Sequence, residues 1–339
     1  MLAATRAIAV LEGRALHVVN ERLLLGPFWR REARLSSLIE ETITTPEKLA
    51  LAGVDPTSTD GDTREVWNYV RALEHGLNSP LPLSGRLLRE MHAILLEGVR
   101  GSRDRPGEYR GEQNYIGDGA RGFARARFVP PPAGATLERC MSELERFMNA
   151  DSTGVPALIA VALTHYQFEC IHPFRDGNGR LGRLLIVLEL CRTKQVTRPW
   201  VYVSDYLESN RDVYKDALLA VSQDGEWEAW IRFMLRGFAA SADDALHRMD
   251  RILALREELR AAVTGPRSSS LMLELIDDLF ERPVISVKRA CALLDITHTA
   301  VRRHLAKLVD LGVIEPLPDI GREQYWIARR ILAVSEDAG

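Results

Sequence analysis

The sequence predicts a mainly α-helical chain with a small β-hairpin and a C-terminal winged helix-turn-helix domain. Apolar residues recur at spacings of three and four through long segments before residue 264, which is the helical period. Strand-like sequence before residue 280 is confined to residues 113–129. After residue 270 the pattern changes to three short amphipathic helices and a hairpin. The helices expected before that change cover residues 65–77, 87–99, 135–148, 157–168, 179–191, 207–221 and 227–263.

Composition narrows the class of protein. The chain has 339 residues with 44 basic and 47 acidic side chains, so its net charge of −3 argues against nucleic-acid or membrane-surface binding along its whole length. An apolar fraction of 46% excludes general disorder. No apolar run is long enough to span a membrane, and the first residues do not resemble a secretory signal. The four cysteines are scattered, which argues against structural zinc and a disulfide framework. We therefore expect a cytoplasmic protein.

The elements divide into three predicted domains. Residues 1–62 form an N-terminal helical segment, and residues 63–263 form a helical core. Within the core, residues 113–129 alternate around a glycine-rich turn and end at three prolines, so they are expected to form a short hairpin. A linker rich in Ser, Gly and Pro at residues 264–270 separates the core from the winged-helix domain, residues 271–335. Because the chemistry described next precedes this linker, we expect the last domain to be separable from it.

One segment stands apart chemically: residues 171–183 read Ile-His-Pro-Phe-Arg-Asp-Gly-Asn-Gly-Arg-Leu-Gly-Arg. Pro173 stiffens the loop beside His172 because its φ is fixed. Gly177 and Gly179 permit positive φ and close approach of a ligand to the backbone. A new helix begins at this turn, so its free N–H groups and the positive end of its dipole predict an anion site.

The charged residues of the same segment extend this interpretation. Arg180 and Arg183 are three residues apart and share a helix face beside the anion site, where they suit a di- or triphosphate. Asp176 directly precedes the turn and is placed to hold Mg²⁺ against the phosphates. His172 is a titratable base at the edge of the site. The lone His92, by contrast, is expected to be structural.

The segment matches, without a departure, the motif His-Pro-Phe-x-Asp/Glu-Gly-Asn-Gly-Arg-x-x-Arg, and the chain therefore resembles the Fic family. Enzymes of this family are mostly protein adenylyltransferases, which move AMP from ATP onto a Ser, Thr or Tyr hydroxyl of a protein. The resemblance covers about residues 30–240, and an appended winged helix is also seen in this branch of the family. Further family-like segments lie at residues 65–69, 107–110, 113–117, 128–132, 207–211 and 227–230.

The resemblance implies a role for each site residue. His172 would take the proton from the target hydroxyl, and Asp176 would coordinate Mg²⁺ that bridges the phosphates of ATP. The flap, residues 113–129, would hold the target protein as an added strand. Modification of the chain itself and a homodimer both remain open. The nucleotide-binding residues would be Gly177, Asn178, Gly179, Arg180, Leu181, Gly182, Arg183, Tyr214 and Lys215. Lys215 departs from the family's second aromatic residue, although its alkyl stem can cover a purine.

A second resemblance lies upstream of the core. Ser36-x-x-x-Glu40 is similar to the family's inhibitory motif, Ser/Thr-x-x-x-Glu-Gly/Asn. The resemblance implies that Glu40 pairs with Arg183 and so occupies the arginine that should hold the γ-phosphate. Glu41 departs from the usual Gly or Asn. The sequence thus predicts a self-inhibited adenylyltransferase.

Two alternative functions remain open. The same site could remove AMP, with Glu40 positioning a water, or the chain could be a DNA-binding regulator that uses the core as a nucleotide sensor. The third helix of the C-terminal domain and its wing offer contacts for DNA, namely Thr297, His298, Thr299, Arg302, Arg303, Lys307 and Arg322. However, residues 271–330 contain nine basic and nine acidic side chains, and a net charge of zero is a weak electrostatic footprint for DNA.

Overall fold

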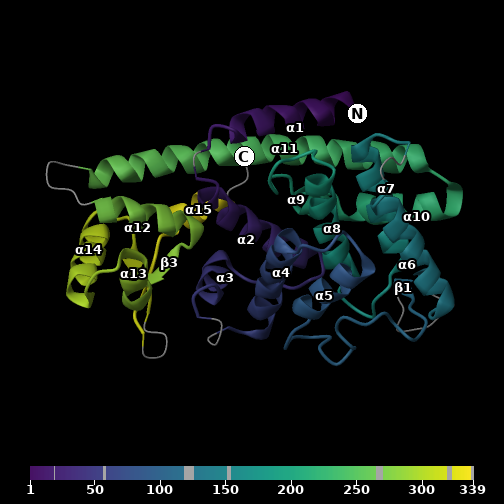
Figure 1. The fold of residues 1–339 in the computed structure, drawn as a ribbon, viewed down its shortest axis with the longest axis horizontal. Helices are drawn as coiled ribbons and strands as arrows, with labels where there is room; N and C mark the ends of the chain where they lie inside the picture. The colour runs from purple at the N-terminus through teal and green to yellow at the C-terminus, as the bar shows by residue number, and fades with distance from the viewer. Residues whose placement is uncertain are drawn as a thin grey trace.

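The computed structural model describes residues 1–18, 20–55, 59–117, 126–150, 154–264, 270–318 and 323–336. Its longest element is α11 (Trp227–Val263), which runs along one edge of the molecule with α1 (Leu2–Ala15) packed beside it (Figure 1). The remaining helices lie on the other side of α11. The helical core is at one end of the molecule and the C-terminal elements are at the other.

The N-terminal segment and the core are almost entirely helical. The N-terminal segment adds two helices to α1, namely α2 (Arg22–Ile39) and α3 (Pro46–Ala52). The core before α11 contains α4 (Gly61–Asn78), α5 (Gly85–Leu95), α6 (Ala135–Met148), α7 (Ala157–Ile171), α8 (Asn178–Arg192), α9 (Ser204–Ser209) and α10 (Arg211–Asp224). Its strands are β1 (Ile116–Gly117) and β2 (Ala126–Phe128).

The mainly helical prediction is confirmed, and the core differs from it in three details. The helix expected over residues 207–221 is two helices, because Asn210 has a non-helical backbone that ends α9 and caps α10. The helix expected over residues 87–99 ends at Leu95. Helix α8 also differs from a one-sided amphipathic helix, because it is buried on nearly every side. It is therefore the central helix of the core.

The flap is a short antiparallel hairpin. Ile116 pairs with Phe128 and Gly117 pairs with Ala126, with a bulge between the two pairs. Arg127 of β2 forms an ion pair of 2.7 Å with Asp216, which ties the flap to α10. The predicted glycine-rich turn lies outside the described residues.

The C-terminal part combines four helices with a three-stranded antiparallel sheet of order β3-β5-β4. Three of its helices and the hairpin fall where the sequence predicts them, whereas β3 and α15 are additions. Residues 265–269 of the expected linker and residues 319–322 of the expected wing, with Arg322, lie outside the described residues. The elements are α12 (Ser270–Glu281), β3 (Val284–Ser286), α13 (Val287–Leu294), α14 (His298–Asp310), β4 (Glu315–Pro316), β5 (Tyr325–Ile327) and α15 (Arg329–Glu336).

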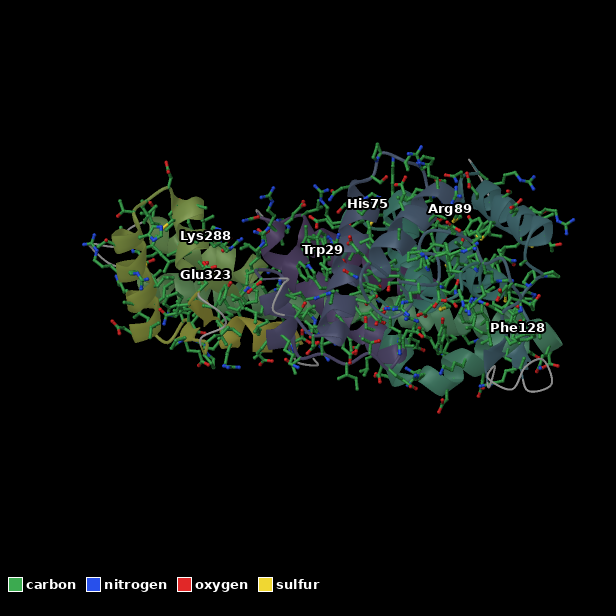
Figure 2. All side chains as sticks on the ribbon, turned by 90° about the horizontal axis from the view of Figure 1, so that it is seen from below. Trp29, His75, Arg89, Phe128, Lys288 and Glu323 are labelled. Carbon is green, nitrogen blue, oxygen red and sulfur yellow. The ribbon has the colours of Figure 1, made fainter. Side chains whose placement is uncertain are left out.

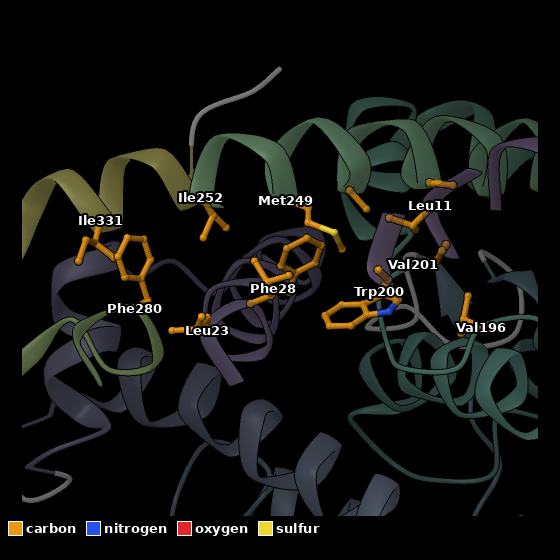
Figure 3. Packing of buried hydrophobic residues seen from close by; sticks show 14 of the residues in the cluster. Leu11, Leu23, Phe28, Val196, Trp200, Val201, Met249, Ile252, Phe280 and Ile331 are labelled. Carbon is orange, nitrogen blue, oxygen red and sulfur yellow. The ribbon is translucent and has the colours of Figure 1, made fainter. Parts of the chain in front are cut away.

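One hydrophobic cluster runs from the core into the C-terminal part. Figure 3 shows Phe28 of α2, Ile252 of α11, Phe280 of α12 and Ile331 of α15 in a single row of buried side chains. Polar contacts reinforce this packing: the Arg30 guanidinium donates to the backbone carbonyl of Glu281 at 2.6 Å. Helix α2 therefore contacts the helical core and the C-terminal part at once.

This packing changes the expectation that the C-terminal domain is separable. A chain ending at Thr264 would expose the buried faces of α2 and α11 that α12 covers. Each large apolar side chain that loses its burial costs about 1.5–3 kcal/mol. We expect urea to unfold the shortened chain at a clearly lower concentration than the full chain, with increased binding of a hydrophobic dye. Equal unfolding midpoints would show that the two parts are energetically independent.

Within the described residues, no helix is long and apolar enough to cross a membrane. All four cysteines are free thiols, each partly buried.

Candidate active site

A pocket of about 490 Å³ lies between the end of α2, the flap, the loop that joins α7 to α8, and α10. It contains four charged side chains of interest: Glu40, Glu169, Arg183 and Arg211. Phe128 of β2, labelled in Figure 2, closes one side. The other lining residues are Ile39, Glu41, Ile116, Gly117, Arg127, Cys170, His172, Gly179, Tyr214, Lys215, Leu218, Leu219 and Ser222.

His172 ends α7 in a left-handed conformation, with φ 47° and ψ 60°. This conformation is uncommon for a residue with a side chain and needs support from its surroundings. Arg110 supplies that support, since its Nε donates to the His172 carbonyl at 2.9 Å and its backbone N–H donates to the Pro173 carbonyl at 2.9 Å. Burial lowers the pKa of His172 to about 4. The imidazole is therefore neutral at pH 7 and able to accept a proton.

The loop after His172 is held by contacts that its sequence spacing does not reveal. The side chain of Asn178 bonds both to the backbone N–H and to the carbonyl of Phe174, each at 2.9 Å. Gly177 has φ +76°, as its predicted role in the turn requires. Asn178 thus closes the turn that precedes α8, rather than pointing its amide into the pocket.

His92 has a structural role, as expected, because its contacts hold this loop in place. Its ring is fully buried and stacks on Phe174 with 3.9 Å between ring centroids. Nδ1 accepts a hydrogen bond from the Gly107 N–H at 2.8 Å, and Nε2 lies 2.9 Å from the Asp176 carbonyl. Because Nδ1 accepts, the proton is on Nε2 and is donated to that carbonyl. Burial lowers the pKa of His92 to about 4.

The low pKa of His92 predicts acid sensitivity. Between pH 6.5 and about 4 the unfolded chain binds a proton at this residue and the folded chain does not, so the free energy of unfolding falls as the pH falls. His92 contributes at most about 3 kcal/mol to this loss. We expect urea titrations across this range to give a smaller loss for His92→Gln than for the unmodified chain. Equal losses would show that protonation of His92 does not contribute to the pH dependence of unfolding.

Glu40 occupies the anion-binding end of α8. Its carboxylate accepts from the Arg183 guanidinium at 2.8 Å and lies directly against Gly179, where a Cβ atom would collide with it. Arg183 also donates to the Ser36 hydroxyl at 2.7 Å and to the Ser36 carbonyl at 2.9 Å. Burial raises the pKa of Glu40, but Arg183, together with Arg180 and His172, outweighs burial, so the net pKa is lowered. The pair is therefore ionised at neutral pH, and the carboxylate fills the place where a phosphate would approach Arg183.

Glu41 stands where the similar family motif usually has Gly or Asn, and its backbone conformation suits those residues. Its φ is +63°, a region that glycine and asparagine enter at low cost. Its side chain turns away from Arg183 and forms an ion pair of 3.3 Å with Arg211. Relief of this backbone strain in Glu41→Gly is expected to raise the free energy of unfolding by about 1 kcal/mol. Urea titration measures the change, and a destabilised variant would contradict it.

Arg180 lies deeper than its predicted phosphate contact suggests. It is almost completely buried and pairs with Glu65 of α4 at 2.5 Å. Asp176, in contrast, is partly exposed and lies 3.9 Å from the Arg180 guanidinium. Its Oδ1 accepts the Gly177 N–H at 2.7 Å.

The side chains of the site suit a magnesium ion that is bound jointly by the protein and a nucleotide, rather than by protein ligands alone. Among the described residues, no three His, Cys, Asp or Glu side chains cluster to hold a metal. Mg²⁺ is commonly bound by one or two carboxylates together with the phosphates of a nucleotide. The exposed carboxylate of Asp176 fits that arrangement.

The remaining predicted residues divide between core and pocket. Leu181 is buried in the core, and Gly182 packs directly against the Glu169 carboxylate. Tyr214 lines the pocket but is largely buried, and its hydroxyl bonds to Nε2 of His165 at 2.9 Å. Lys215 lines the pocket, as expected.

Sequence reasoning missed two charged residues of the pocket. Glu169 lies one turn before His172, and burial raises the pKa of its carboxyl to about 7. Arg211 donates to the Ile39 carbonyl and so fastens the end of α2 to α10. The spacing Glu-x-x-His was the available signal for Glu169, whereas nothing local marks Arg211 as a contact of α2.

Solved structures with a similar architecture define the class of protein. A Fic family protein from Desulfovibrio desulfuricans aligns with a TM-score of 0.61 at 22% identity, over 96% of this chain and 95% of that one. Fic-1 from C. elegans aligns with a TM-score of 0.55 at 21% identity, over 73% of this chain and 72% of that one. This chain therefore has the helical Fic fold.

Two models of a single family cover more than half of the sequence. The Fic/DOC family N-terminal model matches residues 1–78, and the Fic/DOC family model matches residues 82–190, which include the loop from His172 to Arg183. The chain belongs to the Fic/DOC family.

Curated relatives match only part of this chain. The protein adenylyltransferase Fic of Culex quinquefasciatus is 34% identical over 130 residues, 38% of this chain and 22% of that protein. The protein of the same name from Drosophila ananassae is 37% identical over 126 residues, 37% of this chain and 21% of that protein. The chain thus aligns with about a fifth of the length of these relatives, which support nucleotidyl transfer in general.

Proposed function

We propose that this chain is a protein adenylyltransferase that transfers AMP from ATP to a Ser, Thr or Tyr hydroxyl of a protein, and that Glu40 inhibits it. The observation that carries the proposal is that a neutral His172 lies in the same pocket as the predicted anion site. At that site Glu40 accepts a hydrogen bond from Arg183 and so obstructs an incoming phosphate. The matched relatives are named protein adenylyltransferases, which supports the same reaction.

The reaction needs a general base, a site that binds the phosphates, and pyrophosphate as the leaving group. His172 takes the proton of the target hydroxyl as its oxygen bonds to the α-phosphorus, and the bond from that phosphorus to the bridging oxygen of pyrophosphate breaks. The N–H groups at the start of α8 stabilise the charge on the α-phosphate. Arg183 binds the γ-phosphate once Glu40 has left it. Arg180 lies behind the pocket, where it also holds Glu65 and faces Asp176.

Asp176 would hold Mg²⁺ together with the phosphates of ATP. The ion supplies charge neutralisation of the phosphates when it is bound. The hydrogen bond from the Gly177 N–H orients this carboxylate before the nucleotide arrives.

The target segment would bind at the flap. Strands β1 and β2 line the pocket next to His172, and a short exposed hairpin can accept a further strand through main-chain hydrogen bonds. The chain itself is one candidate target, and a homodimer is one way to present it.

We also propose that residues 271–335 form a winged-helix domain after a catalytic core at residues 63–263. Its helices α12, α13 and α14 with the antiparallel sheet β3-β5-β4 support this assignment. Residues 1–62, with Ser36 and Glu40, form the inhibitory segment.

The decisive experiment is intact-mass measurement after incubation with Mg²⁺ and each nucleoside triphosphate in turn, with and without a mixture of candidate proteins. A gain of one AMP, with ATP alone as donor, supports the proposal. A gain from another nucleotide corrects the donor. Release of AMP from a protein that already carries it, without any transfer, would identify the chain as the reverse enzyme.

A further inference from the structure

The charges of the C-terminal part are distributed unevenly, although their sum over residues 271–330 is zero. Four of the nine acidic side chains there are held in ion pairs, as are four of the basic ones, namely Arg282, Arg289, Arg329 and Arg330. Asp277 pairs with Arg256 and Arg260 of α11, which lie outside this part of the chain. The other acidic pairs are Asp278 with Arg289, Glu281 with Arg282, and Glu315 with Arg329. Part of the negative charge is thus neutralised, and for Asp277 this neutralisation lies at the junction with α11.

The positive charges on α14 are not neutralised in this way. Arg302, Arg303 and Lys307 are all exposed. In the part of the chain that the structure describes, no acidic side chain forms an ion pair with any of them. Burial lowers the pKa of His304 between them, and the neighbouring Arg303 and Lys307 lower it further. Lys288 of α13 is also exposed and without an ion pair among the described residues.

Helix α14 presents these cations on one face, at whose C-terminal end the exposed Asp310 also lies. Val301, Leu305 and Leu308 are buried against the rest of the C-terminal part, so the opposite side of the helix faces solvent. Arg303 and Lys307 are four residues apart and lie one above the other on that side. Ala306, exposed between them, leaves the backbone of the helix open to close approach.

We propose that this face of α14 binds double-stranded DNA by entering the major groove. Helix α13, the turn at Asp295 with φ +51° and α14 form a helix-turn-helix, in which the second helix is the one that enters the groove. Thr297 caps α14, and the exposed His298 and Thr299 stand in its first turn, where such helices meet base edges. The cations further along the helix reach the phosphates.

The proposed DNA site on α14 lies far from the pocket at His172. Figure 1 places α14 at the end of the molecule that is remote from α10 and the flap, and Figure 2 shows Lys288 and Phe128 toward opposite ends. DNA binding therefore does not compete with the nucleotide for space, and this inference does not depend on AMP transfer.

The test is fluorescence anisotropy of the full chain with a labelled mixed-sequence duplex of about 30 base pairs, at salt concentrations from about 50 to 200 mM. We expect binding that weakens steeply with salt. The variant Arg302→Ala/Arg303→Ala/Lys307→Ala should bind at least about tenfold more weakly at the lowest salt, with a salt slope smaller by about 2–3.

A matched control removes the same number of charges elsewhere. Arg6, Arg139 and Lys194 are exposed cations on other elements, and their triple alanine variant should bind DNA as the unmodified chain does. Folding of both variants is checked by their urea midpoints. No binding by the unmodified chain at the lowest salt would overturn the proposal. Equal losses in the two variants, no loss in the α14 variant, or equal affinity for a single strand of the same length would overturn it as well.

Discussion

Replacing His172 by alanine is expected to lower the rate of AMP transfer by about 10²–10⁴-fold, the usual contribution of a general base. The reason is that burial keeps the imidazole neutral and able to accept a proton, and that Arg110 holds its backbone in place beside the pocket. The measurement is single-turnover transfer from labelled ATP, made in the Glu40→Gly background so that inhibition does not mask the loss.

Binding of ATP separates a chemical loss from a structural one. His172 acts on the target hydroxyl and not on the phosphates, so calorimetry should give nearly unchanged ATP affinity for the variant. His17, an exposed histidine outside the pocket, provides the matched control, because His17→Ala should change neither rate nor affinity. Near-normal turnover in His172→Ala would remove this residue from the reaction.

Glu40→Gly is expected to raise the rate of transfer by about ten- to a hundredfold. Arg183 cannot satisfy the Glu40 carboxylate and a γ-phosphate with the same nitrogen, and the two anions would also repel each other. A charge-assisted pair of this kind contributes about 1.5–3 kcal/mol, and each 1.4 kcal/mol corresponds to about tenfold in rate. The measurement is labelled-ATP transfer at equal concentrations of folded protein.

Three companion variants make this prediction specific. Arg183→Ala should not gain activity, because it loses the phosphate contact together with the inhibitory pair, and the double variant should resemble it. Glu41→Gly should also leave transfer near its original rate, since Glu41 pairs with Arg211 and not with Arg183. Equal rates for the unmodified chain and Glu40→Gly would show that residues 36–41 are only a structural helix end.

The sequence predicts the local parts of the site better than its distant contacts. The turn before α8 could be predicted because its glycines, the helix start and the charged residues lie within one short segment. The contact of Glu40 with Arg183, which is 143 residues away, was predicted only from the resemblance to a family motif. The partners of Arg180 and His172 could not, since Glu65 is 115 residues from Arg180 and Arg110 is 62 residues from His172. Such contacts arise from tertiary packing, which the order of residues along one segment does not express.

Short elements and backbone conformation explain the other differences. Strand β3 has three residues, which is too few for a periodic pattern to separate it from a loop. The split between α9 and α10 depends on the backbone of the single residue Asn210. For Glu41, the departure from Gly or Asn was visible in the sequence, but its positive φ was not.

Helix α2 contacts both Arg183 in the pocket and the C-terminal part of the chain, so a movement of the whole helix affects both sets of contacts. Its C-terminal end holds Arg183 through Ser36, and its N-terminal half is anchored to the C-terminal part through Gly26 and Arg30. A rigid tilt of the whole helix would have to break both sets of contacts at once. Unwinding of the last turn would free Arg183 while the anchored half stays in place, because only Ser36 and the residues after it need to move. In the proposed inhibition, the barrier to activation is therefore set by the fraying of one helix end, and the contacts of α2 confine that fluctuation to a few residues next to the pocket.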